Sequence, residues 1–142
     1  MSFDGVVVVT AAIVERDGRF LLTRRLQGTH LAGTWEFPGG KCEPGESLEA
    51  CLARELMEEL AVACTVGHAV LVTRHAYAER TVELHFFATT LSGDPVPQLG
   101  QEMRWASRGD LGTLPFPETT PEILLTFTWL MTGTMLVKCC TR

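Results

Sequence analysis

The chain has 142 residues, a length that suits one domain, and 46% of them are hydrophobic against 20% charged, so a core of ordinary size can be buried. The formal net charge of −5 excludes the broadly basic surface that binding to duplex nucleic acid requires. An anionic substrate would therefore need a few placed cations or a metal ion. We expect residues 1–142 to form a single domain.

The first expected element is a buried strand over residues 6–14, VVVVTAAIV, in which β-branched residues run almost without a break. This run is too short to span a bilayer and lacks the basic flank of a signal peptide, so we expect no membrane segment. Asp17 and Gly18 tolerate the positive φ of a tight hairpin turn, which leads to a return strand over 19–25. The Gly- and Pro-rich stretch 26–46 predicts a loop with one short strand.

Ser47 is the expected N-cap of a helix that runs to about Leu60. The strand patterns that follow cover residues 68–77, 80–91 and 102–107, with a loop at 92–101. Thr120 and Pro121 have the pattern of an N-cap and first helical residue for a second helix over 121–131. Strands mixed with two helices indicate an α/β domain with a mixed sheet.

The cysteines give no sign of a structural metal site or a disulfide framework. There are five of them: Cys42, Cys51, Cys64, Cys139 and Cys140. None forms a C-x-x-C pair, zinc-type spacing is missing, and the odd count speaks against complete pairing. We therefore expect free thiols in a reducing cytoplasm.

Three glutamates crowd the end of the first helix: Glu55, Glu58 and Glu59. At about 100° per residue they fall within an arc of roughly 100°. Arg54 can pair with Glu58, but Glu55 and Glu59 have no cation four residues on. Such carboxylates are ligands that Mg2+ prefers, and a solvated acidic face is the alternative. The apolar residues expected to face the core are Ala50, Ala53, Leu56, Met57 and Leu60.

The residues around this cluster resemble the Nudix box, G-x5-E-x7-R-E-U-x-E-E-x-G-U, where U is a bulky apolar residue. The matching positions are Gly40, Glu46, Arg54, Glu55, Leu56, Glu58, Glu59 and Val62. Ala61 stands where the family has a glycine that ends the helix in a turn, so we expect a loss of stability there and not of activity. The segments LLTRR, WEFPGGKCEPGE, LSGDP, GQEMRWAS and LPFPETTPEI are similar, in the same order, to the MutT branch of the family.

The resemblance implies a Nudix-type α/β/α sandwich with a mixed β-sheet. It also implies hydrolysis of a nucleoside diphosphate linked to another group, which in the MutT branch is conversion of nucleoside triphosphates to monophosphate and pyrophosphate. The metal ligands carried over are Glu55, Glu58, Glu59 and the carbonyl of Gly40, holding Mg2+ with Mn2+ as the alternative. Glu46 is expected to support them through water or neighbouring contacts, and Arg54 to orient a glutamate through an ion pair.

Hydrolysis of a phosphoanhydride needs neutralised phosphate charge and a deprotonated water in line with the leaving group. Glu58, Glu59 and Glu102 are three alternatives for the carboxylate that takes the proton. Relatives place an acidic residue on the loop of Glu102, although one register puts Arg104 there. The residues expected to contact the phosphates or the base are Arg25, Lys41, Phe37, Thr119 and Thr120.

Three functions stay open at this stage. The first is a cytoplasmic, Mg2+-dependent pyrophosphohydrolase of nucleoside triphosphates, normal or oxidised, that sanitises the nucleotide pool. Relatives selective for oxidised guanine use an asparagine where this chain has Thr119 or Thr120, which argues against selectivity for 8-oxo-dGTP. The second is a hydrolase of another substrate, such as a dinucleoside polyphosphate, which Tyr77 favours. The third is a non-catalytic nucleotide sensor, and the complete set of box glutamates argues against it. In each case the partner is a small-molecule nucleotide, and oligomeric state is not readable.

Overall fold

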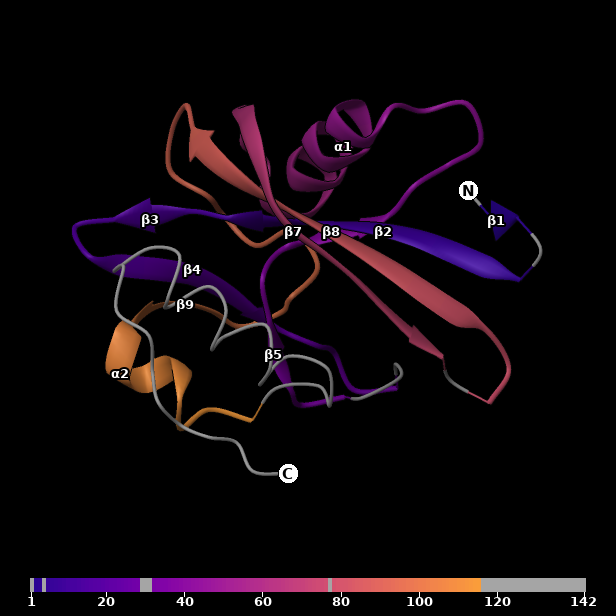
Figure 1. The fold of residues 1–142 in the computed structure, drawn as a ribbon. Coiled ribbons are helices and arrows are strands. Elements are labelled where there is room, and N and C mark those ends of the chain that lie inside the picture. The colour runs from indigo at the N-terminus through magenta and orange to yellow at the C-terminus, as the bar shows by residue number, and fades with distance from the viewer. Residues whose placement is uncertain (1, 4, 29–31, 77, 116–142) are drawn as a thin grey trace.

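The computed structural model describes residues 2–3, 5–28, 32–76 and 78–115. Two β-sheets and two helices form this part of the chain (Figure 1). The first sheet contains β1 (Ser2–Phe3), β2 (Val6–Ile13), β6 (Gly39–Lys41), β7 (Cys64–Ala76) and β8 (Thr81–Leu91). The second contains β3 (Glu15–Arg16), β4 (Arg19–Arg24), β5 (Trp35–Glu36) and β9 (Met103–Ser107). The helices are α1 (Leu48–Leu60) and α2 (Arg108–Leu111).

The first sheet is mixed, as predicted. Its order is β1-β2-β8-β7, with β6 also paired to β2. Strands β2 and β8 run parallel, whereas β1 and β6 pair with β2 in antiparallel fashion, as β7 does with β8. The α/β class with a mixed sheet is therefore confirmed. The second sheet is antiparallel in all its pairings, and the strand patterns alone do not reveal it.

Two local turns follow from the residues that form them. Asp17 and Gly18 have φ angles of 51° and 76°, which confirms the predicted hairpin between β3 and β4. Strand β6 lies in the stretch expected to be mostly loop. A β-carbon on Gly39 would collide with the carbonyl oxygen of Thr10, so glycine is what lets β6 approach β2 this closely.

Helix α1 begins and ends as the sequence predicts. The Ser47 hydroxyl accepts a hydrogen bond from the backbone N–H of Ala50, which confirms the N-cap. Ala61 has a φ of 52° and donates its N–H to the carbonyl of Met57, so alanine occupies the left-handed position that glycine usually takes.

The predicted core face of α1 is only partly right. Its buried residues are Cys51, Leu52, Leu56 and Leu60, whereas Ala50 is exposed and Met57 is 50% exposed. The leucines at 52, 56 and 60 form one i, i+4 row that faces the sheet. This rotation of the helix places Glu55 and Glu59 at the edge of the core and leaves Glu58 in solvent.

The core has two parts on either side of the central strands. One joins both sheets and α2, and it contains Phe20, Leu22, Trp35, Phe37 and Phe86 among others. The other joins both sheets to α1, and it contains Leu21, Leu52, Leu56, Leu60 and Phe87 among others. Neighbouring residues of β4 and of β8 therefore point into different parts of the core, which fixes α1 firmly against the sheets.

The expectation of free thiols is wrong for two cysteines. Cys42 and Cys51 are paired as a disulfide, with their Cα atoms 5.2 Å apart. The pairing of β6 with β2 brings Cys42 beneath the buried side of α1, a proximity that linear spacing does not reveal. Cys64 is free, as predicted, and Cys139 and Cys140 lie outside the described residues.

Three further predictions fall on residues that the structure does not describe: the helix over 121–131, the pair Thr119 and Thr120, and Tyr77. Within the described part of the chain, no helix has the length and apolar character needed to cross a bilayer.

Candidate functional site

Two of the predicted metal ligands, Gly40 and Glu55, lie where β6 contacts α1. Gly40 lies in β6 opposite Thr10, and a β-carbon at this position would overlap the carboxyl group of Glu55. The Glu55 carboxylate, which is 13% exposed, thus packs directly against the backbone of Gly40. The structure therefore brings these two predicted ligands together, and it does so because residue 40 lacks a side chain.

Arg54 organises the carboxylates on the outer side of this contact. Its Nε and Nη2 atoms donate to the two carboxylate oxygens of Glu46 at 2.6 and 2.9 Å. Its Nη1 donates to Glu55 at 3.0 Å and to Glu58 at 3.2 Å, so the predicted pair with Glu58 is present. Nη2 also donates to the backbone carbonyl of Lys41 at 3.1 Å. Arg54 thereby links the loop before the helix to the glutamates on it.

These hydrogen bonds change the ionisation of their partners. The hydrogen bonds from Arg54 and from the backbone N–H of Glu43 lower the pKa of Glu46 to about 2. The same contact with Glu46, followed by that with Glu55, raises the pKa of Arg54. Glu46 and Arg54 are therefore a fixed charge pair beside the helix, which matches the supporting positions predicted for them.

Glu59 differs from the other glutamates because it is partly buried among negative charges. Burial raises its pKa to about 8, and a hydrogen bond with Glu55 and the charges of Glu55, Glu36 and Glu58 act in the same direction. Glu59 thus carries a proton at neutral pH when nothing positive lies beside it. A bound cation would replace that proton, so the surplus of negative charge fits a metal ion.

The donor set also fits a hard cation by its chemistry. Carboxylates of α1 and the backbone carbonyl of Gly40 supply only oxygen, which Mg2+ and Mn2+ prefer. Among the described residues, no three side chains of His, Cys, Asp or Glu already converge as a metal-binding group. In α1 the carboxylates of Glu55 and Glu58 both contact Arg54, so a metal would compete with this guanidinium for them.

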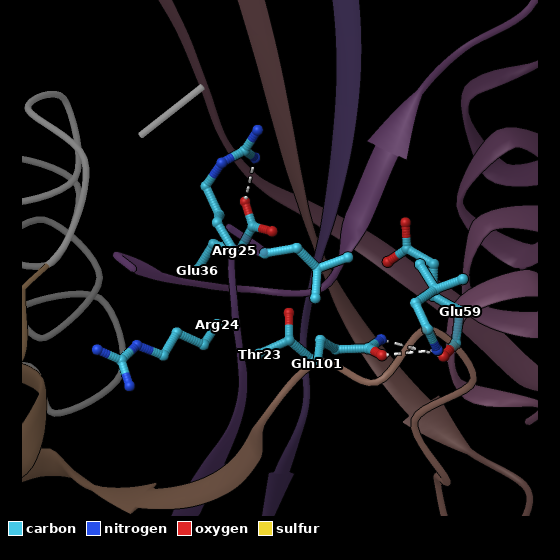
Figure 2. Close-up of a pocket in the computed structure, with 8 residues that line it drawn as sticks. Thr23, Arg24, Arg25, Glu36, Glu59 and Gln101 are labelled. Carbon is cyan, nitrogen blue, oxygen red and sulfur yellow. Dashed lines mark hydrogen bonds and ion pairs between the residues drawn. The ribbon is translucent and has the colours of Figure 1, made fainter. Parts of the chain in front are cut away.

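A pocket opens beside Glu59, between α1 and the second sheet (Figure 2). It is lined by Thr23, Arg24, Arg25, Leu26, Glu36, Glu59, Leu99 and Gln101. Arg25 donates to Glu36 at 2.9 Å, and burial raises the pKa of Glu36 although Arg25 opposes this shift. The pocket therefore lies between the glutamate helix on one side and β4 with the loop after it on the other. The side chain of Arg24 extends away from Glu59 and pairs with Glu102 instead (Figure 2).

The loop between β8 and β9 packs against the end of α1 and contributes Leu99 and Gln101 to the pocket wall. The Gln101 side chain donates to the backbone carbonyl of Glu59 at 3.2 Å and accepts the N–H of Leu99 at 2.9 Å, as the dashed lines in Figure 2 mark. Backbone N–H groups of Gln98 and Val96 donate to the carbonyls of Glu59 and Leu60. This loop thus satisfies the carbonyl groups that the end of α1 leaves open.

Sequence reasoning missed Glu36 and Gln101 as pocket residues. For Glu36 the available signal is its place between two aromatic residues in WEFPGG, since a lone carboxylate in an apolar strand needs a partner. No local pattern distinguishes Gln101, because its contact with Glu59 joins residues 42 positions apart.

Three other predicted residues, Glu102, Lys41 and Phe37, do not line this pocket. Glu102 is not among the pocket-lining residues; its carboxylate accepts from Arg24 at 2.9 Å and is 62% exposed. Lys41 is exposed next to Gly40. The Phe37 ring is buried and packs edge-on against Phe86, with 6.1 Å between the ring centroids. The roles of Glu102, Lys41 and Phe37 stay predictions.

Known proteins and a family model resemble this chain over most of its length. The family model described as "NUDIX domain" matches residues 9–126. The chain is 46% identical over 80 residues to a CTP pyrophosphohydrolase of Escherichia coli, a match that covers 56% of this chain and 59% of that protein. It is 32% identical over 123 residues to an 8-oxo-dGTP diphosphatase of Haemophilus influenzae, covering 84% and 89%. Among solved structures, the MutT protein of Methanosarcina mazei superposes with a TM-score of 0.82 at 26% identity, covering 92% and 99%.

Proposed function

This chain belongs to the NUDIX domain family, and on that premise we propose that it is a Mg2+-dependent pyrophosphohydrolase of nucleoside triphosphates. It would convert a normal or oxidised triphosphate to the monophosphate and pyrophosphate, and so sanitise the nucleotide pool of the cytoplasm. Its partner in this reaction is a small-molecule nucleotide. The single domain proposed for residues 1–142 would hold the complete site.

One observation supports the proposal: a surplus of carboxylates beside a pocket that Arg25 also lines. Glu59 holds a proton because burial and neighbouring glutamates disfavour its charge, and it lines the same pocket as Arg24 and Arg25. A polyphosphate with its divalent cation matches this arrangement, since the cation would neutralise the glutamates and Arg25 would pair with phosphate oxygens.

The residues that would hold the metal are Gly40, Glu55, Glu58 and Glu59. When bound, Mg2+ supplies neutralisation of phosphate charge and acidifies water. Arg54 fixes the outer carboxylates and, through the carbonyl of Lys41, the loop before α1. Arg25, held by Glu36, would orient the substrate at the far wall of the pocket.

The proton of the attacking water must pass to a carboxylate. We favour Glu59 for this role because, of the three candidates, it is the one that lines the pocket. Glu58 and Glu102 remain the alternatives, and both are more than half exposed. Separate Gln variants of the three, compared by kcat at saturating Mg2+, would identify the base.

The names of two relatives indicate which triphosphates to test as substrates. One similar protein is a CTP pyrophosphohydrolase and another an 8-oxo-dGTP diphosphatase, so both a pyrimidine and an oxidised purine triphosphate belong in the test. Pyrophosphate release with Mg2+ should be measured for the normal dNTPs, CTP, 8-oxo-dGTP, ADP-ribose and diadenosine polyphosphates. Preferential turnover of one triphosphate would support the proposal. Turnover of a dinucleoside polyphosphate alone would favour the second function, and metal binding without turnover of any member would favour the sensor.

A further inference from the structure

The disulfide between Cys42 and Cys51 joins the two segments that carry the proposed metal ligands. Cys42 directly follows β6, which contains Gly40, and Cys51 lies in α1, one turn before Glu55. Both cysteines are buried, with 5% and 0% of their surface exposed. Their bond therefore links the end of β6, the strand that contains Gly40, to the glutamate helix α1.

The sulfur of Cys51 also lies beside the site itself. It is 3.7 Å from the carbonyl oxygen of Gly40 and 3.3 Å from the hydroxyl oxygen of Thr10. In the disulfide this sulfur has no hydrogen, so the Thr10 hydroxyl is the donor and the Gly40 carbonyl keeps its lone pairs. In the reduced form a thiol S–H would face the same carbonyl as a weak donor.

We propose that Cys42 and Cys51 form a reversible redox site that sets how tightly Gly40 and α1 hold the divalent cation. The proposal rests on the proposed function for the location of the metal. The disulfide form is the one that binds the cation more tightly. Its two segments are held together covalently, and no thiol competes for the Gly40 carbonyl.

The redox step is exchange with a small disulfide such as oxidised glutathione. The thiolate of Cys42 attacks one sulfur of the small disulfide, which forms a mixed disulfide and releases one small thiol. The thiolate of Cys51 then attacks the Cys42 sulfur and releases the second small thiol, so the protein loses two electrons and two protons. Cys42 is the entry point because Glu43, Pro44 and Gly45 after it form an exposed turn, whereas Cys51 is within a helix.

Reversibility is what makes the pair a control site. Disulfides that form in a reducing cytoplasm are usually transient or redox-sensing. Reduction frees the loop at Cys42 and restores the thiol next to Gly40, and both changes weaken the support of the metal. Altered support of this kind commonly lowers metal affinity at least tenfold.

The test uses the full chain in two states, oxidised with glutathione disulfide and reduced with a phosphine that is then removed. Alkylation and peptide mapping by mass spectrometry identify the cysteine partners. Electron paramagnetic resonance of free Mn2+ gives the dissociation constant without turnover. Cys64→Ser is the matched control, because it removes the cysteine that is free in the described part of the chain and leaves the disulfide intact.

We expect a Cys42–Cys51 linked peptide in the oxidised sample, and a dissociation constant for Mn2+ that rises about tenfold on reduction in the wild type and in Cys64→Ser. Cys42→Ala should bind Mn2+ as weakly as the reduced wild type, whatever its redox state. Cys51→Ala serves in its place if circular dichroism shows that Cys42→Ala is unfolded.

Two results would overturn the inference. The first is alkylation of both Cys42 and Cys51 after oxidation. The second is a linked peptide with the same Mn2+ affinity in both states. A tenfold shift in affinity without hydrolysis of any nucleotide would instead reject the proposed function and leave the redox site standing, because neither readout depends on catalysis.

Discussion

The proton that Glu59 holds gives the proposed metal site a pH dependence of defined sign. Its pKa is about 8 instead of the usual 4.5, first because of burial and then because of Glu55, Glu36 and Glu58. A cation that binds this carboxylate must displace the proton. We therefore expect metal affinity to rise with pH up to about pH 8 and to level off above it.

The size of the effect follows from the same pKa. At pH 6 about one molecule in a hundred has a charged Glu59, and at pH 8 about half do. The dissociation constant for Mn2+ should therefore fall about fiftyfold from pH 6 to pH 8. The number of protons released per bound metal should be about 0.9 at pH 7 and about 0.5 at pH 8.

Resonance titrations with Mn2+ at several pH values would give the dissociation constants, and calorimetry in two buffers of different ionisation enthalpy would count the protons. Glu59→Gln is the matched control, because the amide keeps the size of the side chain but has no proton to lose. Its affinity should be lower and nearly independent of pH over this range. Equal pH slopes for the wild type and Glu59→Gln would refute the reasoning.

The other predictions concern activity and stability. Glu58→Gln should lose most Mg2+-dependent turnover at an unchanged melting temperature, since this side chain is 59% exposed; wild-type rates would contradict its role. Ala61→Gly should raise the free energy of unfolding in urea by about 0.5–1 kcal/mol, because φ is 52° there; no gain would mean that the alanine is unstrained. Leu56→Ala should lower it by about 2–5 kcal/mol in one cooperative transition, and two transitions would contradict a single domain. Without metal, the free energy of unfolding should fall as pH rises from 4.5 to 8, because the folded state holds the Glu59 proton that the unfolded state has released; a rise would contradict the raised pKa.

Local rules account for most of what the sequence predicts correctly. The Ser47 cap, the Asp17–Gly18 turn and the left-handed Ala61 each depend on a few consecutive residues, and all three are present. The spacing of Glu55, Glu58 and Glu59 likewise places them on neighbouring faces of one helix. Resemblance to a known pattern then predicts a metal site at these glutamates without any knowledge of the sheets.

Features that depend on distant pairing are not readable in the same way. The second sheet requires β4 to pair with β9, whose residues lie 80 to 88 positions from their partners in the chain. The disulfide requires β6 to add to β2, and the raised pKa of Glu59 depends first on burial of its side chain and, to a smaller extent, on Glu36 of β5. The rotation of α1 that exposes Met57 depends on which row of leucines fits the sheet, a choice that helical periodicity alone leaves open.

The loop between β8 and β9 also bears on how this enzyme tolerates change in its sequence. The backbone N–H of Val96 donates to the carbonyl of Leu60, and the backbone N–H of Gln98 and the side chain of Gln101 both donate to the carbonyl of Glu59. Replacing the exposed Val96 side chain leaves these contacts in place, because only its main chain takes part. An inserted residue between Val96 and Gln98 would shift the donors of Gln98 and Gln101 away from the Glu59 carbonyl while Val96 stays bound to Leu60. Variation in this surface loop should therefore proceed by substitution and not by change of length.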